Sequence, residues 1–300
     1  MPSTNAAYLK TRPLALAGID FSQVSDTELV ALFNRTLDKG FHGISFSPYL
    51  PGQGPGTEIA AEQIQERLSI IQSSVRWIRS FSCTEGNEAI PRIAHENGLK
   101  TMVGAWLGSD PDKNRREIDG VIAVAKAGHA DIVAVGNEVL LRGDLSEDEL
   151  IDCIRRVKKA VPEAQVGYVD AYFEFVDHPR VTDACDVILA NCYPFWEGCS
   201  AEYALLYMKD MYRRAVAAAA GKRVIISETG WPNIGTATGA AMPSTPNAIR
   251  YFLNTCQWAE EDGIEIFYFS SFDEDWKIED EGDVGAYWGL WDKTGRRKYR

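Results

Sequence analysis

Short apolar runs alternate with amphipathic segments along most of the 300-residue chain. The runs are rich in Val, Ile, Ala and Phe, which is typical of parallel strands that are buried on both faces. The segments between them carry apolar residues at helical spacing, and one begins with a capping box formed by Ser146 and Glu149. From Ile44 onward the pattern predicts eight strands, at residues 43–49, 75–81, 100–106, 131–139, 165–169, 186–194, 223–229 and 264–272.

This alternation predicts one α/β catalytic domain, a closed (β/α)8 TIM barrel over residues 41–300. No shift in composition divides these residues, and barrels of this length fold as one unit. A doubly wound open sheet is the alternative, but no G-x-G-x-x-G turn follows its first strand. Residues 1–40 form an N-terminal extension with a short strand at 14–20 and a helix that begins at Ser25. We expect this extension to pack on the barrel as a cap at its bottom.

The fourth and seventh predicted strands each end in a glutamate, Glu138 and Glu228. A buried carboxylate is costly unless it has a partner or a function, and barrel enzymes carry their reactive groups at the carboxyl ends of strands. Two carboxyl groups across a cleft suit cleavage of a glycosidic bond, because one protonates the leaving oxygen while the other attacks the anomeric carbon or activates water. Asn137 is placed to bind the sugar 2-hydroxyl. The structural alternative is that each glutamate only pairs with a buried arginine such as Arg79.

Aromatic residues follow several of the predicted strand ends. Their flat faces suit pyranose rings, and although core packing explains any one of them better, as a set at strand ends they favour a sugar groove. The set is Trp106, Tyr193, Phe195, Trp196, Trp231, Phe272 and Trp276. After the last strand, Glu274 and Lys277 have the spacing of a charge pair that would bind sugar hydroxyls, and the acidic residues 279–283 are expected to form a solvated loop.

Composition excludes several other classes of protein. The formal net charge of −12 argues against a nucleic-acid partner, since phosphate binding needs clustered Lys and Arg. Six cysteines without a C-x-x-C pair and four histidines without an H-E-x-x-H pattern predict neither a metal site nor a cofactor. Buried free thiols are favoured, with a bridge among Cys185, Cys192 and Cys199 as the alternative. No signal region or membrane-spanning stretch is apparent, which leaves the location open between the cytoplasm and a soluble, periplasmic domain of a larger protein. We also expect a monomer.

The ordered motifs of the chain resemble those of glycoside hydrolase family 17, whose members act on β-1,3-glucans and include endo-glucanases and glucanosyltransferases. The combination of a Gly-Asn-Glu motif with a later Glu-Thr-Gly-Trp-Pro motif is specific, and the resemblance spans roughly residues 41–300. The matching stretches are 43–49, which ends at Tyr49, 135–139, 191–194, 227–232, 272–277 and 288–292.

The resemblance implies a retaining mechanism without a cofactor, with Glu138 as acid/base and Glu228 as nucleophile. It places Tyr193 near the nucleophile and Glu274 with Lys277 in the cleft, and we add Tyr49 and Arg79 to the substrate-binding residues. The Asp275-Trp276 pair is similar to the bacterial and fungal branch, in which glucan transfer is common. We therefore expect glucanosyl transfer through a glucosyl-enzyme. A hydrolytic endo-β-1,3-glucanase and a non-catalytic β-glucan-binding protein remain the alternatives.

Overall fold

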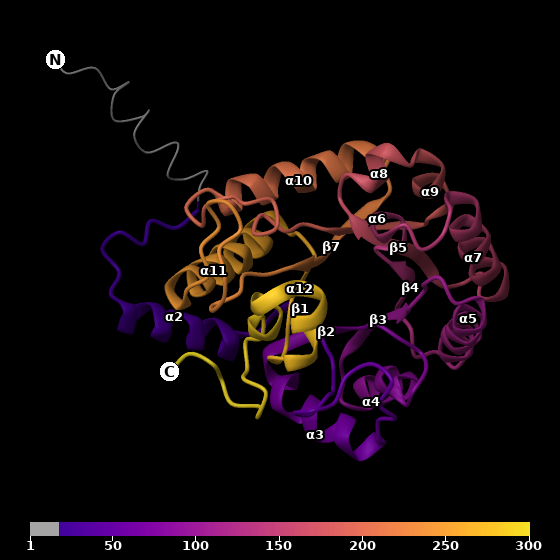
Figure 1. Ribbon diagram of the computed structural model, residues 1–300, viewed down its shortest axis with the longest axis horizontal. Helices are drawn as coiled ribbons and strands as arrows, with labels where there is room; N and C mark the ends of the chain where they lie inside the picture. The colour runs from indigo at the N-terminus through magenta and orange to yellow at the C-terminus, as the bar shows by residue number, and fades with distance from the viewer. Residues whose placement is uncertain (1–17) are drawn as a thin grey trace.

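The computed structural model describes residues 18–300 and contains a closed barrel of parallel strands that pair in chain order. The predicted (β/α)8 fold is confirmed, and Figure 1 shows the helices as a ring around the strands. The strands are β1 (Phe41–Ser45), β2 (Val75–Ser80), β3 (Lys100–Ala105), β4 (Ile132–Asn137), β5 (Gln165–Ala171), β6 (Val187–Asn191), β7 (Arg223–Thr229) and β8 (Ile266–Tyr268).

The longer helices agree with the sequence pattern to within a few residues. In α7 the predicted capping box is present, because Ser146 accepts the Glu149 amide and Glu149 accepts the Ser146 amide. Four short helices, α6, α8, α9 and α12, are not predicted, since so few residues cannot display a helical period. The α-helices are α2 (Asp26–Lys39), α3 (Ala61–Ile71), α4 (Ile90–Glu96), α5 (Pro111–Lys126), α6 (Val139–Arg142), α7 (Glu147–Ala160), α8 (Glu174–Asp177), α9 (Pro179–Ala184), α10 (Ala204–Ala218), α11 (Thr245–Asp262) and α12 (Ile278–Glu281). The 3-10 helices are η1 (Gln72–Ser74), η2 (Asn87–Ala89), η3 (Asp275–Lys277) and η4 (Gly282–Tyr287).

The strands are buried on both faces, which explains their nearly continuous apolar sequence. Side chains that point inward fill the barrel with a cluster of their own, and those that point outward pack beneath the helices in a larger cluster. The inner cluster consists of Met102, Ile132, Ala134, Val169, Val187, Leu189, Ile225 and Phe267. The barrel is thus a filled core, and ligands have access only at its ends.

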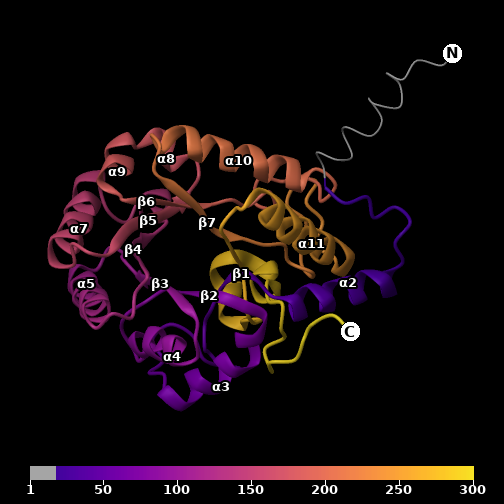
Figure 2. The same ribbon diagram turned by 180° about the vertical axis from the view of Figure 1, so that it is seen from behind.

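The extension before β1 contributes a helix to the outer ring. Helix α2 begins with a capping box at Ser25 and packs Phe33 edge-on against Phe252 of α11, with ring centroids 5.3 Å apart. Figures 1 and 2 show α2 on the flank of the barrel beside α11, so its placement as a cap at the bottom is wrong. The segment after β8 has only short helices, and α2 takes up the space beside α11. The strand expected at 14–20 falls mostly outside the described residues.

The chain turns sharply where β4 ends. The pattern predicts a strand through Val139, but β4 ends at Asn137 and Glu138 adopts a left-handed conformation with φ of 50°. Gly136 also has a positive φ of 86°, and a Cβ there would approach a methyl group of Val139 to 2.9 Å. The turn therefore requires glycine at position 136 and directs Glu138 away from the strand direction.

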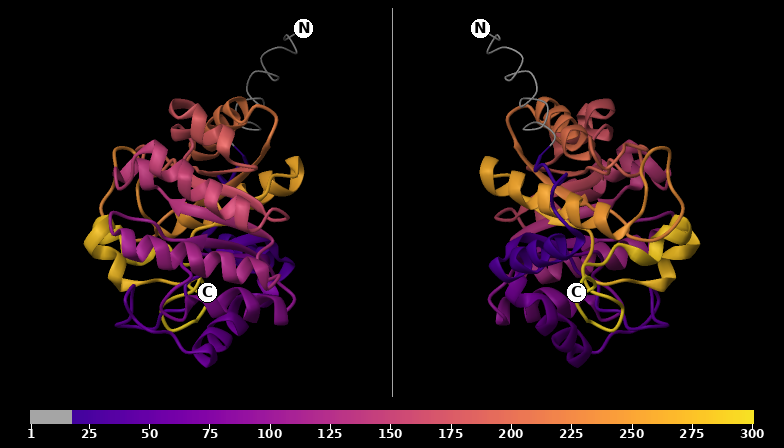
Figure 3. Two further views of the ribbon diagram at one scale, coloured as in Figure 1. Left: turned by 90° about the vertical axis from the view of Figure 1, so that its right-hand side faces the viewer. Right: turned by 90° about the vertical axis from the view of Figure 1, so that its left-hand side faces the viewer.

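The segment after β8 lies across one end of the barrel. Figure 1 shows this segment, which contains η3, α12 and η4, over the middle of the ring of helices, and the side views of Figure 3 place it at one edge of the molecule. Within residues 18–300, no helix combines the length and apolar character needed to cross a membrane. All six cysteines lie in the described part of the chain and are free, so a bridge among Cys185, Cys192 and Cys199 is excluded.

Candidate active site

Three polar side chains at the carboxyl ends of β4, β6 and β7 line one cleft of about 490 Å³. They are Glu138, Asn191 and Glu228. The two glutamates, predicted from strand ends far apart in sequence, therefore share one cavity. The remaining lining residues are Leu141, Ala171, Tyr172, Phe173, Tyr193, Trp196, Glu197, Phe269, Asp280, Glu281 and Trp288.

Glu228 is held by a cation and a hydroxyl group. Its Oε1 accepts a hydrogen bond from Nη1 of Arg79, whose side chain is only 2% exposed, and its Oε2 accepts one from the Tyr193 hydroxyl at 2.7 Å. Burial, with the charge of Glu228, raises the pKa of Tyr193 well above its ordinary value, so the hydroxyl stays a donor. A buried guanidinium beside the carboxylate offsets the desolvation of its charge.

Within residues 18–300, no cation is in direct contact with the Glu138 carboxyl group. Its backbone amide donates to the Val169 carbonyl at 2.8 Å, and its Oε1 accepts a hydrogen bond from Nδ2 of Asn191 at 2.8 Å. Burial first, and the charge of Glu228 second, raise the pKa of Glu138 to about 7. Near neutral pH this carboxyl group therefore holds a proton for a large part of the time, as a general acid must.

Asn191 is oriented by a second hydrogen bond. Its Oδ1 accepts from Oγ of Ser227 at 2.8 Å, which leaves the amide nitrogen to face Glu138. Ser227 directly precedes Glu228 on β7, and the Cys192 amide donates to the Glu228 carbonyl at 2.9 Å. The end of β6 thus ties the surroundings of both glutamates together.

The turn after Glu138 is held by Tyr168 and Asp170 of β5. The Tyr168 hydroxyl accepts the Leu140 amide at 2.9 Å and donates to Asp170, which also accepts the Leu141 amide at 3.4 Å. Asp170 is completely buried, and burial raises its pKa to about 6. These contacts fix α6 against β5 and with it the backbone that carries Glu138.

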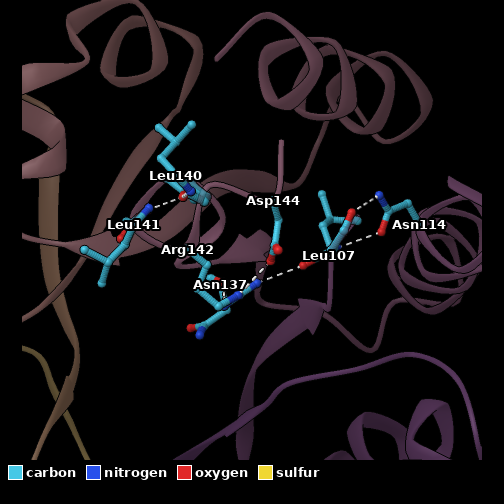
Figure 4. Close-up of polar contacts among 10 residues, drawn as sticks. Leu107, Asn114, Asn137, Leu140, Leu141, Arg142 and Asp144 are labelled. Carbon is cyan, nitrogen blue, oxygen red and sulfur yellow. Dashed lines mark hydrogen bonds and ion pairs between the residues drawn. The ribbon is translucent and has the colours of Figure 1, made fainter. Parts of the chain in front are cut away.

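Arg142 fixes the same turn from the opposite side. Its Nη1 donates to the Asn137 carbonyl at 2.5 Å, its Nη2 to the Leu107 carbonyl at 3.0 Å, and its Nε pairs with Asp144 at 2.7 Å. Figure 4 shows the side chain reaching from α6 to both carbonyl groups. One guanidinium therefore joins the loop after β3 to the end of β4.

Asn137 lies beside this cleft in a defined orientation. Its Oδ1 accepts a hydrogen bond from Nη2 of Arg79 at 2.7 Å. Nδ2 forms no hydrogen bond to any residue within 18–300 and retains solvent-accessible surface. Arg79 thus orients Asn137 as a donor, as contact with a sugar hydroxyl would require.

Several predicted sugar contacts are buried instead. Phe195 is fully buried and Trp231 is 1% exposed, so the prediction that they contact sugar is wrong. The Trp231 indole packs against Phe195 and Tyr251, and its Nε1 donates to the Met242 carbonyl at 3.1 Å. The backbone next to Trp231 lies close to the end of β8, because a Cβ at Gly230 would lie only 2.2 Å from the carbonyl oxygen of Phe269, the residue after that strand. This close packing contributes to the burial of Trp231.

The charged residues predicted to bind substrate support the cleft from behind. Glu274 and Lys277 form the expected pair, with Nζ 2.6 Å from Oε2, but they are 5% and 6% exposed and are not among the lining residues. Lys277 lies 4.1 Å from the ring centroid of Phe269, which does line the cleft. Arg79 is likewise buried behind Glu228. We therefore correct the assignment of these three residues from substrate contact to support.

Three predicted aromatic contacts lie outside the cleft that holds the glutamates. Trp106 is half-buried beneath Arg142, whose guanidinium carbon is 5.0 Å from the ring centroid. Tyr49 and Trp276 are also half-buried and meet edge-on at 6.2 Å. None of the three lines the cavity described above.

Sequence reasoning missed several residues of the site. Asn191, which lines the cleft, and Asp170, which holds the turn after Glu138, are polar residues at the ends of buried strands, so the criterion that found the glutamates applies to them as well. Tyr172, Phe173 and Trp288 stand in loops, where no periodicity marks them. Glu281 belongs to the segment expected to be a solvated loop, yet it faces the cavity.

A closed (β/α)8 barrel whose carboxyl-end cleft holds two glutamates in unequal settings has the architecture of a glycoside hydrolase. A family model described as the BtgE/BtgC glycoside hydrolase domain matches residues 43–289, and the chain belongs to this family. The resemblance to glycoside hydrolase family 17 is thereby confirmed.

Individual proteins of known name agree with this assignment. A glucan 1,3-beta-glucosidase from Arthroderma benhamiae is 30% identical, with 76% of this chain and 79% of that protein covered. The Saccharomyces cerevisiae glucan 1,3-beta-glucosidase is 25% identical, with 81% and 86% covered. The crystal structure of a family 17 beta-1,3-glucanosyltransferase from Rhizomucor miehei is 25% identical with a TM-score of 0.78, over 87% of this chain and 96% of that one. An active-site mutant of that enzyme has been solved with laminaritriose.

Proposed function

We propose that this protein is a retaining enzyme that acts on β-1,3-glucan through a glucosyl-enzyme intermediate and favours glucanosyl transfer. The observation that carries the proposal is the unequal setting of the two glutamates in one cleft. Glu228, paired with Arg79, is suited to be the ionised nucleophile, and Glu138, with its pKa raised to about 7, is suited to be the acid. The names of the fungal relatives support β-1,3-glucan as the substrate class.

The reaction proceeds in two displacements. Glu228 attacks the anomeric carbon while Glu138 donates its proton to the departing glycosidic oxygen, which leaves with the bonding electron pair. A covalent glucosyl ester of Glu228 and an ionised Glu138 result. Glu138 then takes a proton from the incoming hydroxyl group as that oxygen attacks the anomeric carbon and releases Glu228, so both glutamates return to their starting states.

Transfer requires that a sugar hydroxyl, rather than water, makes the second attack. The apolar surface near Glu138 supports this preference, since Leu141, Tyr172 and Phe173 line the cleft beside the acid/base. Leu141 is 48% exposed and Trp196, also at the cleft, is 41% exposed. Solvent-exposed apolar side chains of this kind suit the faces of an acceptor sugar.

Hydrolysis is the second candidate, because the Arthroderma and Saccharomyces relatives are named glucosidases. Sizing the products formed from laminaripentaose separates the two. We expect products longer than the starting oligosaccharide, joined through new β-glycosidic bonds in nuclear magnetic resonance spectra, and any product released by water should appear first as the β-anomer. Exclusively shorter products would assign hydrolysis, an initial α-anomer would remove the retaining mechanism, and binding without any turnover would indicate a glucan-binding protein.

A further inference from the structure

Glu281 is the last residue of α12, in the acidic stretch that follows Lys277. Its neighbour Glu279 is exposed and lies outside the cleft, and Asp280 is exposed where it borders the cleft. The Glu281 side chain is less exposed than either and lines the cleft together with Glu138 and Glu228. The sequence does not distinguish Glu281 from the two acids before it, and only the tertiary structure shows that Glu281 is directed into the cleft.

Within residues 18–300, the Glu281 carboxyl group has the Trp288 indole as a hydrogen-bonding neighbour, but neither oxygen forms a hydrogen bond of normal geometry. Oε2 is shielded from solvent and lies toward the indole of Trp288, whose Nε1 is also shielded and lacks a partner of normal geometry among the same residues. Oε1 retains accessible surface. A largely buried carboxyl group whose hydrogen-bonding capacity is unused is expensive, and a ligand that fills the cleft would relieve that cost.

The charges around Glu281 come from β7 and from the segment after β8. Burial raises the pKa of Glu281 to about 7, Lys277 and the Trp288 indole oppose this rise, and the charges of Glu228 and Glu274 add to it. The Lys277 ammonium is bonded to Glu274 at 2.6 Å, so it attracts Glu281 without satisfying it. Near neutral pH the carboxyl group is thus present in both protonation states, able to accept a hydrogen bond and, when protonated, to donate one.

We propose that Glu281 is a substrate-binding residue that holds a hydroxyl group of the glucan on the side of the cleft facing Glu228. A sugar hydroxyl is both donor and acceptor, which matches a carboxyl group in either state. The proposal rests on the proposed action on β-1,3-glucan and adds a contact that fixes the sugar against the nucleophile.

The test compares two replacements of similar size, Glu281→Gln and Glu281→Leu. Both are made in a Glu138→Gln background, which prevents turnover, and the Kd for laminaritriose is measured by calorimetry. Glutamine retains a donor and an acceptor, so its Kd should stay within about 3-fold of the background protein, whereas leucine should weaken binding roughly 10-fold by losing the hydrogen bond. Glu279→Leu, on an exposed position of the same helix, is the matched control and should bind like the background.

Leucine suits a buried position, and melting temperatures verify that each variant is folded. Equal affinity of the leucine variant and the background would overturn the role of Glu281, as would an equal loss in the leucine and glutamine variants. If the background protein itself fails to bind laminaritriose at millimolar concentration, the proposed substrate is wrong and the inference falls with it. The two failures are therefore distinguishable in one series of measurements.

Discussion

The ends of β4 and β7 carry the same amino acid in opposite surroundings. On β7, Glu228 lies within the strand and is bound by the Arg79 guanidinium and the Tyr193 hydroxyl. On β4, Glu138 lies just beyond the strand in a left-handed turn, and its side chain is bound by the neutral amide of Asn191. One carboxyl group thus has a positive partner and the other does not.

This difference is enough to divide the chemical roles. A guanidinium in contact favours the charged form of a carboxyl group, whereas burial next to another negative charge favours the protonated form. Two chemically identical groups in one cleft can therefore act as nucleophile and acid at the same pH. The predictions below test this division, beginning with the largest effect.

Replacing either glutamate by alanine should reduce turnover of laminari-oligosaccharides roughly 10³-fold or more, because in the proposed mechanism each participates in both displacements. Azide distinguishes the two roles. In Glu228→Ala, azide should occupy the vacated space and attack the anomeric carbon directly, giving an α-glucosyl azide. In Glu138→Ala, it should attack the glucosyl-enzyme and give the β-azide.

The configuration of each azide product can be read by nuclear magnetic resonance. The reversed pattern, with the β-azide from the Glu228 variant, would exchange the two roles and contradict the argument from Arg79. Unimpaired turnover in either variant would remove that glutamate from the mechanism.

Arg79→Met should lower kcat/KM roughly 10²-fold and destabilise the fold by about 3 kcal/mol, since removing one partner of a buried ion pair leaves an uncompensated charge. It also frees the Asn137 amide, which Arg79 orients. Arg67→Met is a matched control, because Arg67 is 3% exposed, lies over the Phe272 ring and forms no ion pair with Glu138 or Glu228.

We expect the Arg67 variant to lose stability in urea unfolding while its folded form keeps its kcat/KM. Similar activity losses in both variants, measured on folded protein, would mean that Arg79 acts on packing alone and not through Glu228.

The pH dependence tests the Glu138 side of the comparison. Its pKa is raised to about 7, so the proton needed for the first step is present below that pH and lost as pH rises through it. The alkaline limb of kcat/KM, which reports the free enzyme, should therefore fall near pH 7. The hydrogen bond from Asn191 favours the ionised form and lowers the pKa of Glu138, so Asn191→Leu should move this limb upward by less than about one pH unit.

A downward shift in the Asn191 variant would contradict this assignment. Asn97→Leu changes an amide far from this cleft, on the segment after α4, and should leave the limb where it is.

The sequence suffices to predict the barrel because eight short apolar runs alternate regularly with amphipathic helical segments, which is the pattern of buried parallel strands joined by helices. It also predicts Glu138 and Glu228, since a carboxylate that ends an apolar strand contradicts the pattern around it. It does not predict that Glu138 lies outside the strand, because the turn depends on Gly136 and on contacts with β5. Nor does it separate Trp196, which is exposed, from Trp231, which is buried, since both follow strand ends.

Residues that act from a distance are the hardest to predict. Arg79 appears in the sequence only as a charge within a strand, and its pairing with both Glu228 and Asn137 requires three strands to be in register. Glu281 lies among other acids in a short helix, and only the packing of α12 across the barrel end selects it. Such roles arise from tertiary contacts that no local pattern records.

The smallest expected effect concerns Arg142, which supports the Glu138 turn without touching either glutamate's carboxyl oxygens. Arg142→Gln removes donors from the Asn137 and Leu107 carbonyls and should lower kcat/KM only about 3- to 10-fold, because Tyr168 and Asp170 still hold the next two amides. The control is Arg180→Gln, since Arg180 is 61% exposed and pairs only with surface acids. An unchanged kcat/KM in the Arg142 variant would show that contacts with β5 alone set the position of Glu138. A loss as large as that of Arg79→Met would show instead that the turn held by Arg142 matters as much to Glu138 as the ion pair with Arg79 matters to Glu228.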